Sequence, residues 1–240
     1  MLLLSVIIDL LVLLAILLVV YVVIAAIWFK GEIRSALERD PAATGPFEVI
    51  LTYPGFHAVV IHKIAHALLK AKVPMIPRII SQTGRGITGI EIHPGAKVGK
   101  GLFIDHGMGV VIGETTVIGN NVTLFQGVTL GGTGKEKGKR HPTIGDNVVI
   151  GAGAKVLGNI KIGNNVVVGA NAVVIKDIPA NSTVVGVPGR VTKREGRKIA
   201  GISLDHTSLP DPLANSIKRL QSEIDKIESE LKDWHGDNRS

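Results

Sequence analysis

The sequence predicts an α+β chain in which a helical N-terminal region precedes a parallel β-helix and a C-terminal coiled-coil helix. Three observations predict it: an apolar first segment, a six-residue aliphatic repeat from Ile92 to Val174, and alternating spacings of four and three in the tail. They divide the 240 residues into a transmembrane helix (1–29), a helical region (30–88), a β-helix domain (89–190) and a tail with a coiled-coil helix (191–240).

The first segment has the length and composition of a membrane span. From Leu10 to Phe29 it carries no charge, and twenty helical residues at about 1.5 Å each reach roughly 30 Å, the thickness of the hydrocarbon core of a bilayer. The aromatic pair that ends it is followed by cations, as in an interfacial belt with cytoplasmic basic residues, at Lys30, Arg34 and Arg39. We therefore expect a single-pass anchor, with the rest of the chain on the cytoplasmic side of the cell membrane.

Two other interpretations of this segment stay open. A cleaved signal peptide normally has a basic start and a shorter apolar core, and neither occurs here. A helix buried in an oligomer interface is the second alternative.

Between residues 30 and 88 the sequence predicts helices. A short amphipathic helix over 32–39 should stop at Asp40, because the residue before Pro41 is pushed out of the α region. A second helix over 55–70 places His62 and His66 one turn apart. No carboxylate lies at a useful spacing from this pair, so we expect packed or surface histidines rather than metal ligands.

Beyond Gly89 aliphatic residues recur every six positions, a period typical of a hexapeptide β-helix. Each repeat should form one face of a triangular prism, with the aliphatic side chain inside and Gly, Asn or Asp at positive φ in the corners. About five coils fit between Ile92 and Val187. The fourteen matching positions are Ile92, Val98, Ile104, Val110, Ile112, Ile118, Leu124, Leu130, Ile144, Ile150, Val156, Ile162, Val168 and Val174.

The tail carries an apolar seam typical of a coiled coil, which suits a three-stranded assembly. A single amphipathic helix packed on the prism is the alternative. The seam consists of Leu213, Ile217, Leu220, Ile224, Ile227, Leu231 and Trp234.

Composition narrows the chemistry. The chain has no cysteine, which excludes disulfides, thiolate zinc sites and a cysteine nucleophile. A formal net charge of +7 fits coenzyme A, nucleic acid, an anionic membrane or simply a basic soluble surface. A GxSxG elbow is also missing, so direct attack by a substrate hydroxyl, with a histidine as general base, is the simpler chemistry.

The repeat is broken twice, and the breaks are where function is expected. Residues 131–143 form a long glycine-rich, basic excursion without the Walker spacing of a P-loop. The second break, over 104–109, places His106 beside Asp105, with Glu91 about one coil earlier. A carboxylate beside an imidazole fixes its tautomer and stabilises its protonated form, although a solvated Glu–His pair has the same spacing.

The motifs around these breaks resemble the serine O-acetyltransferases of the hexapeptide-repeat acyltransferase superfamily. The similarity runs from about Asp40 to Pro212 and is most specific in three segments, Asp105-His106-Gly107-Met108-Gly109, Gly131-Gly132-Thr133-Gly134-Lys135 and Arg140-His141-Pro142. The resemblance implies a left-handed β-helix and transfer of acetyl from acetyl-CoA to the hydroxyl of L-serine. O-acetylserine and CoA would form, as in cysteine biosynthesis.

The resemblance also implies a role for each matching residue. His106 would be the general base and Glu91 its carboxylate partner. Asp40 and Asp105 would hold the serine ammonium, Arg140 its carboxylate, and His141 would position the substrate. Acetyl-CoA, a co-substrate rather than a bound cofactor, would lie between subunits near Gly131, Gly132, Thr133, Ala152 and Ala170. No metal and no nucleic acid is expected.

The expected partners follow from the same resemblance and from two differences between this chain and the family, one in the helical region and one at the C-terminus. We expect a homotrimer, with a hexamer as the alternative, because the helical region that often joins two trimers is shortened here. Many relatives end in an isoleucine that inserts into O-acetylserine sulfhydrylase. This chain ends Asp237-Asn238-Arg239-Ser240, which argues against that complex.

Three other functions stay open from the sequence. A membrane-associated acyltransferase of this superfamily acting on a sugar would have little use for Arg140 opposite two aspartates. A metal-dependent prism of the hexapeptide carbonic anhydrase type needs three converging histidines, for which His93, His106 and His141 are available. A non-catalytic membrane scaffold would leave the Glu91 and His106 pair unexplained.

Overall fold

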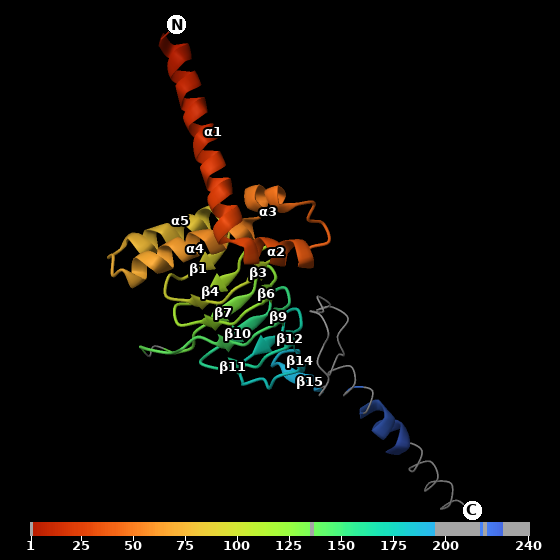
Figure 1. Ribbon diagram of the computed structural model, residues 1–240. Coiled ribbons are helices and arrows are strands. Elements are labelled where there is room, and N and C mark those ends of the chain that lie inside the picture. Colours follow the sequence, from red (N-terminus) through yellow and green to blue (C-terminus); the bar gives the residue numbers. More distant parts are fainter. Residues whose placement is uncertain (1, 135–136, 195–216, 218–219, 228–240) are drawn as a thin grey trace, which may run out of the picture.

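A computed structural model describes residues 2–134, 137–194, 217 and 220–227 of the chain. A group of helices sits on one end of a three-sided β prism, and the long first helix projects away from it (Figure 1). The helices are α1 (Leu2–Trp28), α2 (Lys30–Arg39), α3 (Pro46–Thr52), α4 (Pro54–Lys70) and α5 (Ile76–Thr88). The helices predicted over 32–39 and 55–70 are thereby confirmed.

Parallel strands form the three faces of the prism. Face A contains β1-β4-β7-β10-β13, face B β2-β5-β8-β11, and face C β3-β6-β9-β12-β14, with β15 antiparallel at its edge. The chain visits A, B and C in turn, which gives the five predicted coils. The strands are β1 (Glu91–Ile92), β2 (Lys97–Val98), β3 (Phe103–Ile104), β4 (Val111–Ile112), β5 (Val117–Ile118), β6 (Thr123–Leu124), β7 (Thr129–Gly131), β8 (Thr143–Ile144), β9 (Val149–Ile150), β10 (Lys155–Leu157), β11 (Lys161–Ile162), β12 (Val167–Val168), β13 (Val173–Val174), β14 (Ser182–Val185) and β15 (Arg190–Arg194).

The aliphatic repeat forms the core. On face A, residues of successive coils lie in register, as Ile112 does with Ile92 and Leu130. Thirteen of the fourteen predicted positions are buried, and Val98 is partly buried against them. Burial of each such side chain contributes roughly 1.5–3 kcal/mol, and stacking makes each coil cover its neighbours.

Asparagines line one corner of the prism, as predicted. Asn121, Asn147, Asn165 and Asn181 all have φ near +55°, a left-handed conformation that asparagine tolerates better than most residues. Their side-chain amides bond from coil to coil at 2.9–3.3 Å. The corner is thus stabilised both by local conformation and by a ladder along the axis.

The helical layer is fixed to the first coil by close contacts. A Cβ atom on Gly55 would collide with the carbonyl oxygen of Ile104, so this glycine lets α4 lie directly against β3. His62 is buried, which lowers its pKa to about 4, and His66 Nδ1 donates to the carbonyl oxygen of Pro94 at 2.7 Å. Both histidines therefore pack between helix and prism, as expected.

Two residues of the predicted interfacial belt after the first helix are buried in the protein. Phe29 is 9% exposed and packs edge-to-face on Phe56, with ring centroids 5.8 Å apart. Arg39 is buried in the prism, where Nη1 lies 3.1–3.3 Å from the carbonyl oxygens of Gly101 and Val122 and from Thr123 Oγ1. Both side chains therefore face the protein, whereas Trp28, Lys30 and Arg34 are exposed.

Among the residues described, one helix has the length and apolar composition of a membrane span, over Leu4–Trp28. From Leu4 to Val20 its side chains are exposed, whereas Ala25 and Phe29 pack against the other helices. In the tail, residues 191–194, 217 and 220–227 are described. Four of the seven seam residues, Ile217, Leu220, Ile224 and Ile227, are among them and are exposed, and the other three lie outside the described residues, so the coiled coil stays a prediction.

Candidate active site

The two breaks in the repeat lie at opposite edges of face A. The register advances by 18 residues between Ile112 and Leu130, by 20 between Ile92 and Ile112, and by 26 between Leu130 and Val156. Two extra residues therefore enter the first corner between faces C and A, and eight enter the corner between β7 and β8. One face of about six residues, roughly 20 Å at 3.3 Å per residue, separates the two edges.

The first edge carries the acidic corner, which we define as Asp40, Tyr53, Asp105 and His106. The hydroxyl of Tyr53 donates to Asp40 Oδ2 at 2.6 Å, and the backbone N–H of Ala42 donates to Asp40 Oδ1 at 2.8 Å. Burial raises the pKa of Tyr53, and the negative charges of Asp40 and Asp105 raise it further. The loop after α2 and the corner after β3 thus place two carboxylates around one phenol.

His106 occupies this corner in an uncommon backbone conformation. Its φ is +56°, and its side chain is 76% exposed with Nε2 4.0 Å from Asp105 Oδ1. At other corners of the prism this conformation belongs to glycine or asparagine. The fold therefore holds an imidazole pointing out of the prism, accessible to a reactant and next to a carboxylate.

Glu91 lies at the same edge, but its carboxylate bonds to α5. Its backbone N–H donates to the carbonyl oxygen of Val110, close after the His106 corner. Its Oε2 is 3.2 Å from Arg85 Nη1, and its Oε1 accepts a 3.4 Å hydrogen bond from Gln82. The pairing of Glu91 with His106 remains a prediction.

The second edge carries the basic corner, defined as Glu114, Thr115, Lys139, Arg140 and His141. Arg140 Nη2 pairs with Glu114 Oε2 at 2.7 Å. Thr115 Oγ1 accepts from the backbone N–H groups of Arg140 and His141 at 3.0 and 3.1 Å. Lys139 Nζ donates to three carbonyl oxygens, including that of Thr115 at 2.7 Å. These bonds fasten the end of the long excursion to the coil before it.

The contacts of His141 fix its tautomer. The backbone N–H of Thr115 donates to Nδ1 at 3.2 Å, and Thr115 Oγ1 lies 2.9 Å from the same atom. Nδ1 is therefore an acceptor, and the proton of the neutral ring sits on Nε2. Burial lowers the pKa of His141, and Arg140 lowers it further while Glu114 opposes both. His141 is thus a neutral donor beside the Arg140 cation.

The residues expected to meet acetyl-CoA are divided between the same two edges. Ala152 and Ala170 follow β9 and β12 on the edge of the acidic corner, where Asn171 N–H donates to the Ala152 carbonyl oxygen. Gly131, Gly132 and Thr133 begin the excursion at the other edge. A single chain therefore does not bring the predicted site residues together.

Sequence reasoning assigned no role to Tyr53, Glu114, Thr115 or Lys139. The strand register contains a signal for two of these residues, Glu114 and Thr115. Both Arg140 and His141 lie 26 residues beyond Glu114 and Thr115, the same interval that separates paired strands on either side of the excursion. Within the described residues no cluster of three or more His, Cys, Asp or Glu has the geometry of a metal site.

Comparisons with known proteins identify a family model and a similar sequence. The family model of the bacterial transferase hexapeptide (six repeats) matches residues 141–176. The serine acetyltransferase of Staphylococcus epidermidis is 60% identical over 200 residues, which cover 83% of this chain and 93% of that protein.

Two solved structures resemble the chain. One is serine acetyltransferase of Neisseria gonorrhoeae in complex with serine, at TM-score 0.67 and 43% identity, covering 69% of this chain and 67% of that one. The other is serine acetyltransferase of Brucella abortus in complex with coenzyme A, at TM-score 0.69 and 43% identity, covering 71% and 68%. With identity this high over most of a relative's length, the chain belongs to the serine acetyltransferase family.

Proposed function

We propose that this chain acetylates L-serine, with a base and ammonium site from one edge of face A and a carboxylate site from the other. The acetyl donor is acetyl-CoA, and the products are O-acetylserine and CoA, as in cysteine biosynthesis. The observation that carries the proposal is the charge of the two edges. Asp105 and Asp40 offer anions where Arg140 offers a cation, which suits the two ends of a zwitterion.

In the proposed reaction His106 is the general base. The serine hydroxyl oxygen attacks the thioester carbonyl carbon while its proton passes to the imidazole of His106. The tetrahedral intermediate then breaks its C–S bond, and the departing CoA sulfur takes the proton back from the imidazolium. Glu91 is proposed to stabilise that imidazolium, which requires its carboxylate to turn from Arg85 towards His106.

We propose that a homotrimer completes the site. The acidic corner of one copy would face the basic corner of the next, because about 20 Å of face A separates them within one chain. Acetyl-CoA would then lie in the groove between copies, with Ala152 and Ala170 from one side and Gly131, Gly132 and Thr133 from the other. Three equivalent sites result, each built from two subunits.

Mixed trimers test this arrangement. His106→Asn and Arg140→Ala each damage a different edge, so at a serine concentration far below the raised KM of Arg140→Ala each variant alone should release little thiol. When the two are co-expressed, about a quarter of the interfaces combine two intact edges, and thiol release should recover to that extent. Absence of recovery would contradict a shared site. An acceptor preference for amino sugars over serine would contradict the proposed substrate.

We also propose that α1 anchors the enzyme in the cell membrane with the prism on the cytoplasmic side. The exposed, uncharged helix surface from Leu10 to Val20 supports this, since apolar patches of that size are rare on soluble proteins. A variant lacking residues 1–20 keeps the segment that packs on α3 and α4. It should remain active and leave the membrane fraction, whereas the full chain should require detergent for extraction.

A further inference from the structure

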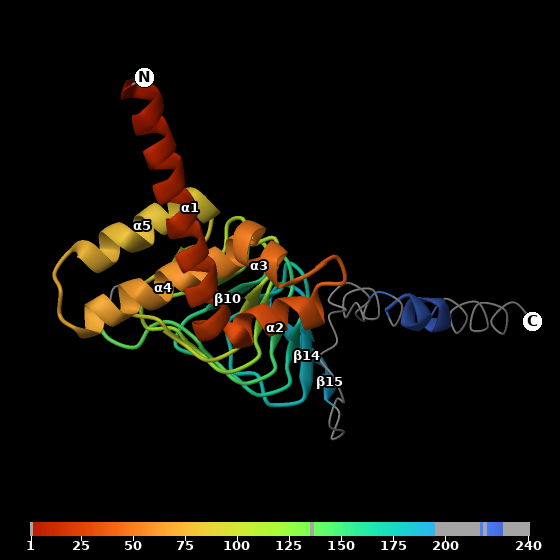
Figure 2. The same ribbon diagram turned by 45° about the horizontal axis from the view of Figure 1, so that its top comes forward.

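The helical end of the prism has an outer surface that the catalytic proposal does not use. In both views α4 and α5 lie side by side across the end from which α1 projects (Figure 2). We propose that this end of the molecule rests on the surface of an anionic lipid bilayer, so that α4 and α5 form a second membrane contact beside α1. The inference rests on the proposed anchoring by α1 and extends it.

The two sides of α5 differ sharply. Towards the prism, Ser81 Oγ donates to the carbonyl oxygen of Ile92 at 2.8 Å, and Arg85 pairs with Glu91. At 100° per residue, the opposite side presents three isoleucines, and α4 adds a fourth to the same layer. These residues are Ile76, Ile79 and Ile87, 45%, 53% and 71% exposed, and Ile64, 51% exposed. We call them the α4–α5 face.

The charge of this layer favours an anionic partner. Residues 49–90 contain five Lys or Arg and no Asp or Glu. Two of the cations are paired inside the protein, Lys63 with Glu32 at 2.6 Å and Arg85 with Glu91. Lys70 and Lys72 are exposed at the turn between α4 and α5. Each basic residue near an anionic membrane surface increases the affinity of the protein for the membrane about fivefold.

The length of the exposed part of α1 determines where the bilayer surface lies relative to the other helices. The stretch of α1 before Tyr21, residues 2–20, is about 29 Å long and nearly equals the hydrocarbon thickness of roughly 30 Å. The last turns, from Tyr21 to Trp28, run beside the other helices. A headgroup layer roughly 5–8 Å deep therefore falls at the level of those turns, where α4 and α5 lie.

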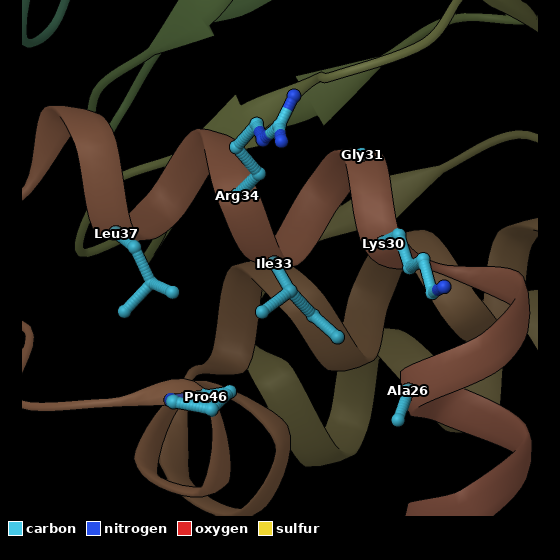
Figure 3. A pocket seen from close by; sticks show the side chains of 7 residues that line it. All are labelled: Ala26, Lys30, Gly31, Ile33, Arg34, Leu37 and Pro46. Atoms are coloured by element: carbon cyan, nitrogen blue, oxygen red, sulfur yellow. The ribbon is translucent and has the colours of Figure 1, made fainter.

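Two apolar clefts open at this level on either side of α1. One, of about 890 Å³, lies between α1 and α4 and is lined by residues such as Val20, Ile24 and Ile64, with Lys63 among them. The other, of about 510 Å³, lies between α2 and α3 (Figure 3). There Ile33 and Leu37 point towards Pro46, and Lys30 stands at the rim. An apolar interior with a cation suits a lipid chain and its headgroup.

Site-directed spin labelling tests the inference in the full chain. Because the chain has no cysteine, a single introduced cysteine reports one position. Ile79→Cys reports the face, Leu13→Cys reports the span, and Ile175→Cys on the last coil is a control of matched exposure, 51% against 53%. Each labelled protein is reconstituted in vesicles of phosphatidylcholine and phosphatidylglycerol. Collision with oxygen is then compared with collision with a water-soluble nickel chelate.

We expect the oxygen-to-nickel collision ratio to be several-fold higher at positions 13 and 79 than at position 175. Replacing both Lys70 and Lys72 by Glu should lower the ratio at position 79 and leave position 13 unchanged. A label at 79 in water, with 13 still in lipid, would overturn the inference and leave the anchor standing. Protection of 79 from both reagents, in vesicles and detergent alike, would assign the face to a second copy instead. A label at 13 in water would overturn the anchor and this inference with it.

Discussion

The acidic and basic corners flank the same face of the prism but are built in different ways. The acidic corner joins distant segments, because Asp40 follows α2 whereas Asp105 and His106 follow β3. The basic corner is made by adjacent coils, and a single side chain, that of Thr115, bonds to the backbone of both Arg140 and His141. His106 is exposed at its corner, whereas His141 is 7% exposed.

This difference matches the proposed tasks of the two corners. A group that binds a carboxylate gains from being fixed before the substrate arrives, because less conformational entropy is lost on binding. A base must reach the hydroxyl and receive its proton, so its imidazole has to stay accessible. The contrast predicts that loss of the His106 imidazole at the acidic corner reduces turnover, and that changes at the basic corner reduce apparent serine affinity.

The largest effect should come from His106→Asn. Asparagine already occupies five prism corners with φ near +55°, so this change removes the imidazole without disturbing the backbone. We expect kcat to fall by about 10²- to 10⁴-fold, the usual contribution of a positioned general base, with little change in the serine KM. Thiol release gives both constants. A kcat within a few-fold of wild type would exclude His106 as the base.

Arg39→Met tests whether the position of Asp40 in the acidic corner depends on the hydrogen bonds that join Arg39 of α2 to the prism. The change removes the three hydrogen bonds of a buried guanidinium next to Asp40 and puts an apolar side chain beside their acceptors, of which the Val122 carbonyl oxygen keeps the backbone N–H of Phe103. The free energy of unfolding should fall by about 2–4 kcal/mol, measured by urea titration in detergent. The serine KM should rise as well, because Asp40 loses its position.

Arg34→Met is the matched control on the same helix. Arg34 is 79% exposed and lies 3.8 Å from Glu38, an exposed i,i+4 pair worth less than about 0.5 kcal/mol. Equal losses of stability in the two variants would mean that Arg39 does not act as the link between helix and prism.

Arg140→Ala should act on binding rather than on turnover. Loss of a charged hydrogen-bond partner for the serine carboxylate costs about 1.5–3 kcal/mol, so the serine KM should rise roughly 10- to 100-fold. Lys137→Ala removes an exposed charge from the same excursion and should leave KM almost unchanged. A larger fall in kcat than rise in KM would place Arg140 at the reacting atoms instead.

The prism was predictable because its signal is local and repeated. Each aliphatic position specifies its own burial, so thirteen positions could be assigned to the core, and the breaks marked where the candidate site residues lie. Arg39 was not predictable in this way. Two of its partners are the backbone carbonyls of Gly101 and Val122, which no side-chain pattern reveals, and beside an apolar helix its charge resembled a membrane flank.

The site was predictable only as a list of residues. That Thr115 bonds His141 depends on a register of 26 residues across the excursion, which the sequence period alone does not give. That Glu91 bonds Arg85 depends on where α5 lies on the first coil. Both facts concern the pairing of segments, and pairing is decided by packing rather than by any single motif.

Thr115→Val should have the smallest effect, confined to the basic corner. The change keeps the shape but removes the hydroxyl that accepts from the backbone of Arg140 and His141, so the serine KM should rise about fivefold, or 1 kcal/mol. The pKa of His141, lowered by burial and by Arg140, should move back towards its ordinary value as the corner loosens. In an NMR titration the ring resonances of His141 should then shift at a higher pH in the variant than in wild type. Thr115→Ser, which retains the hydroxyl, should restore both, and failure to do so would mean that the methyl group rather than the hydrogen bonds positions His141.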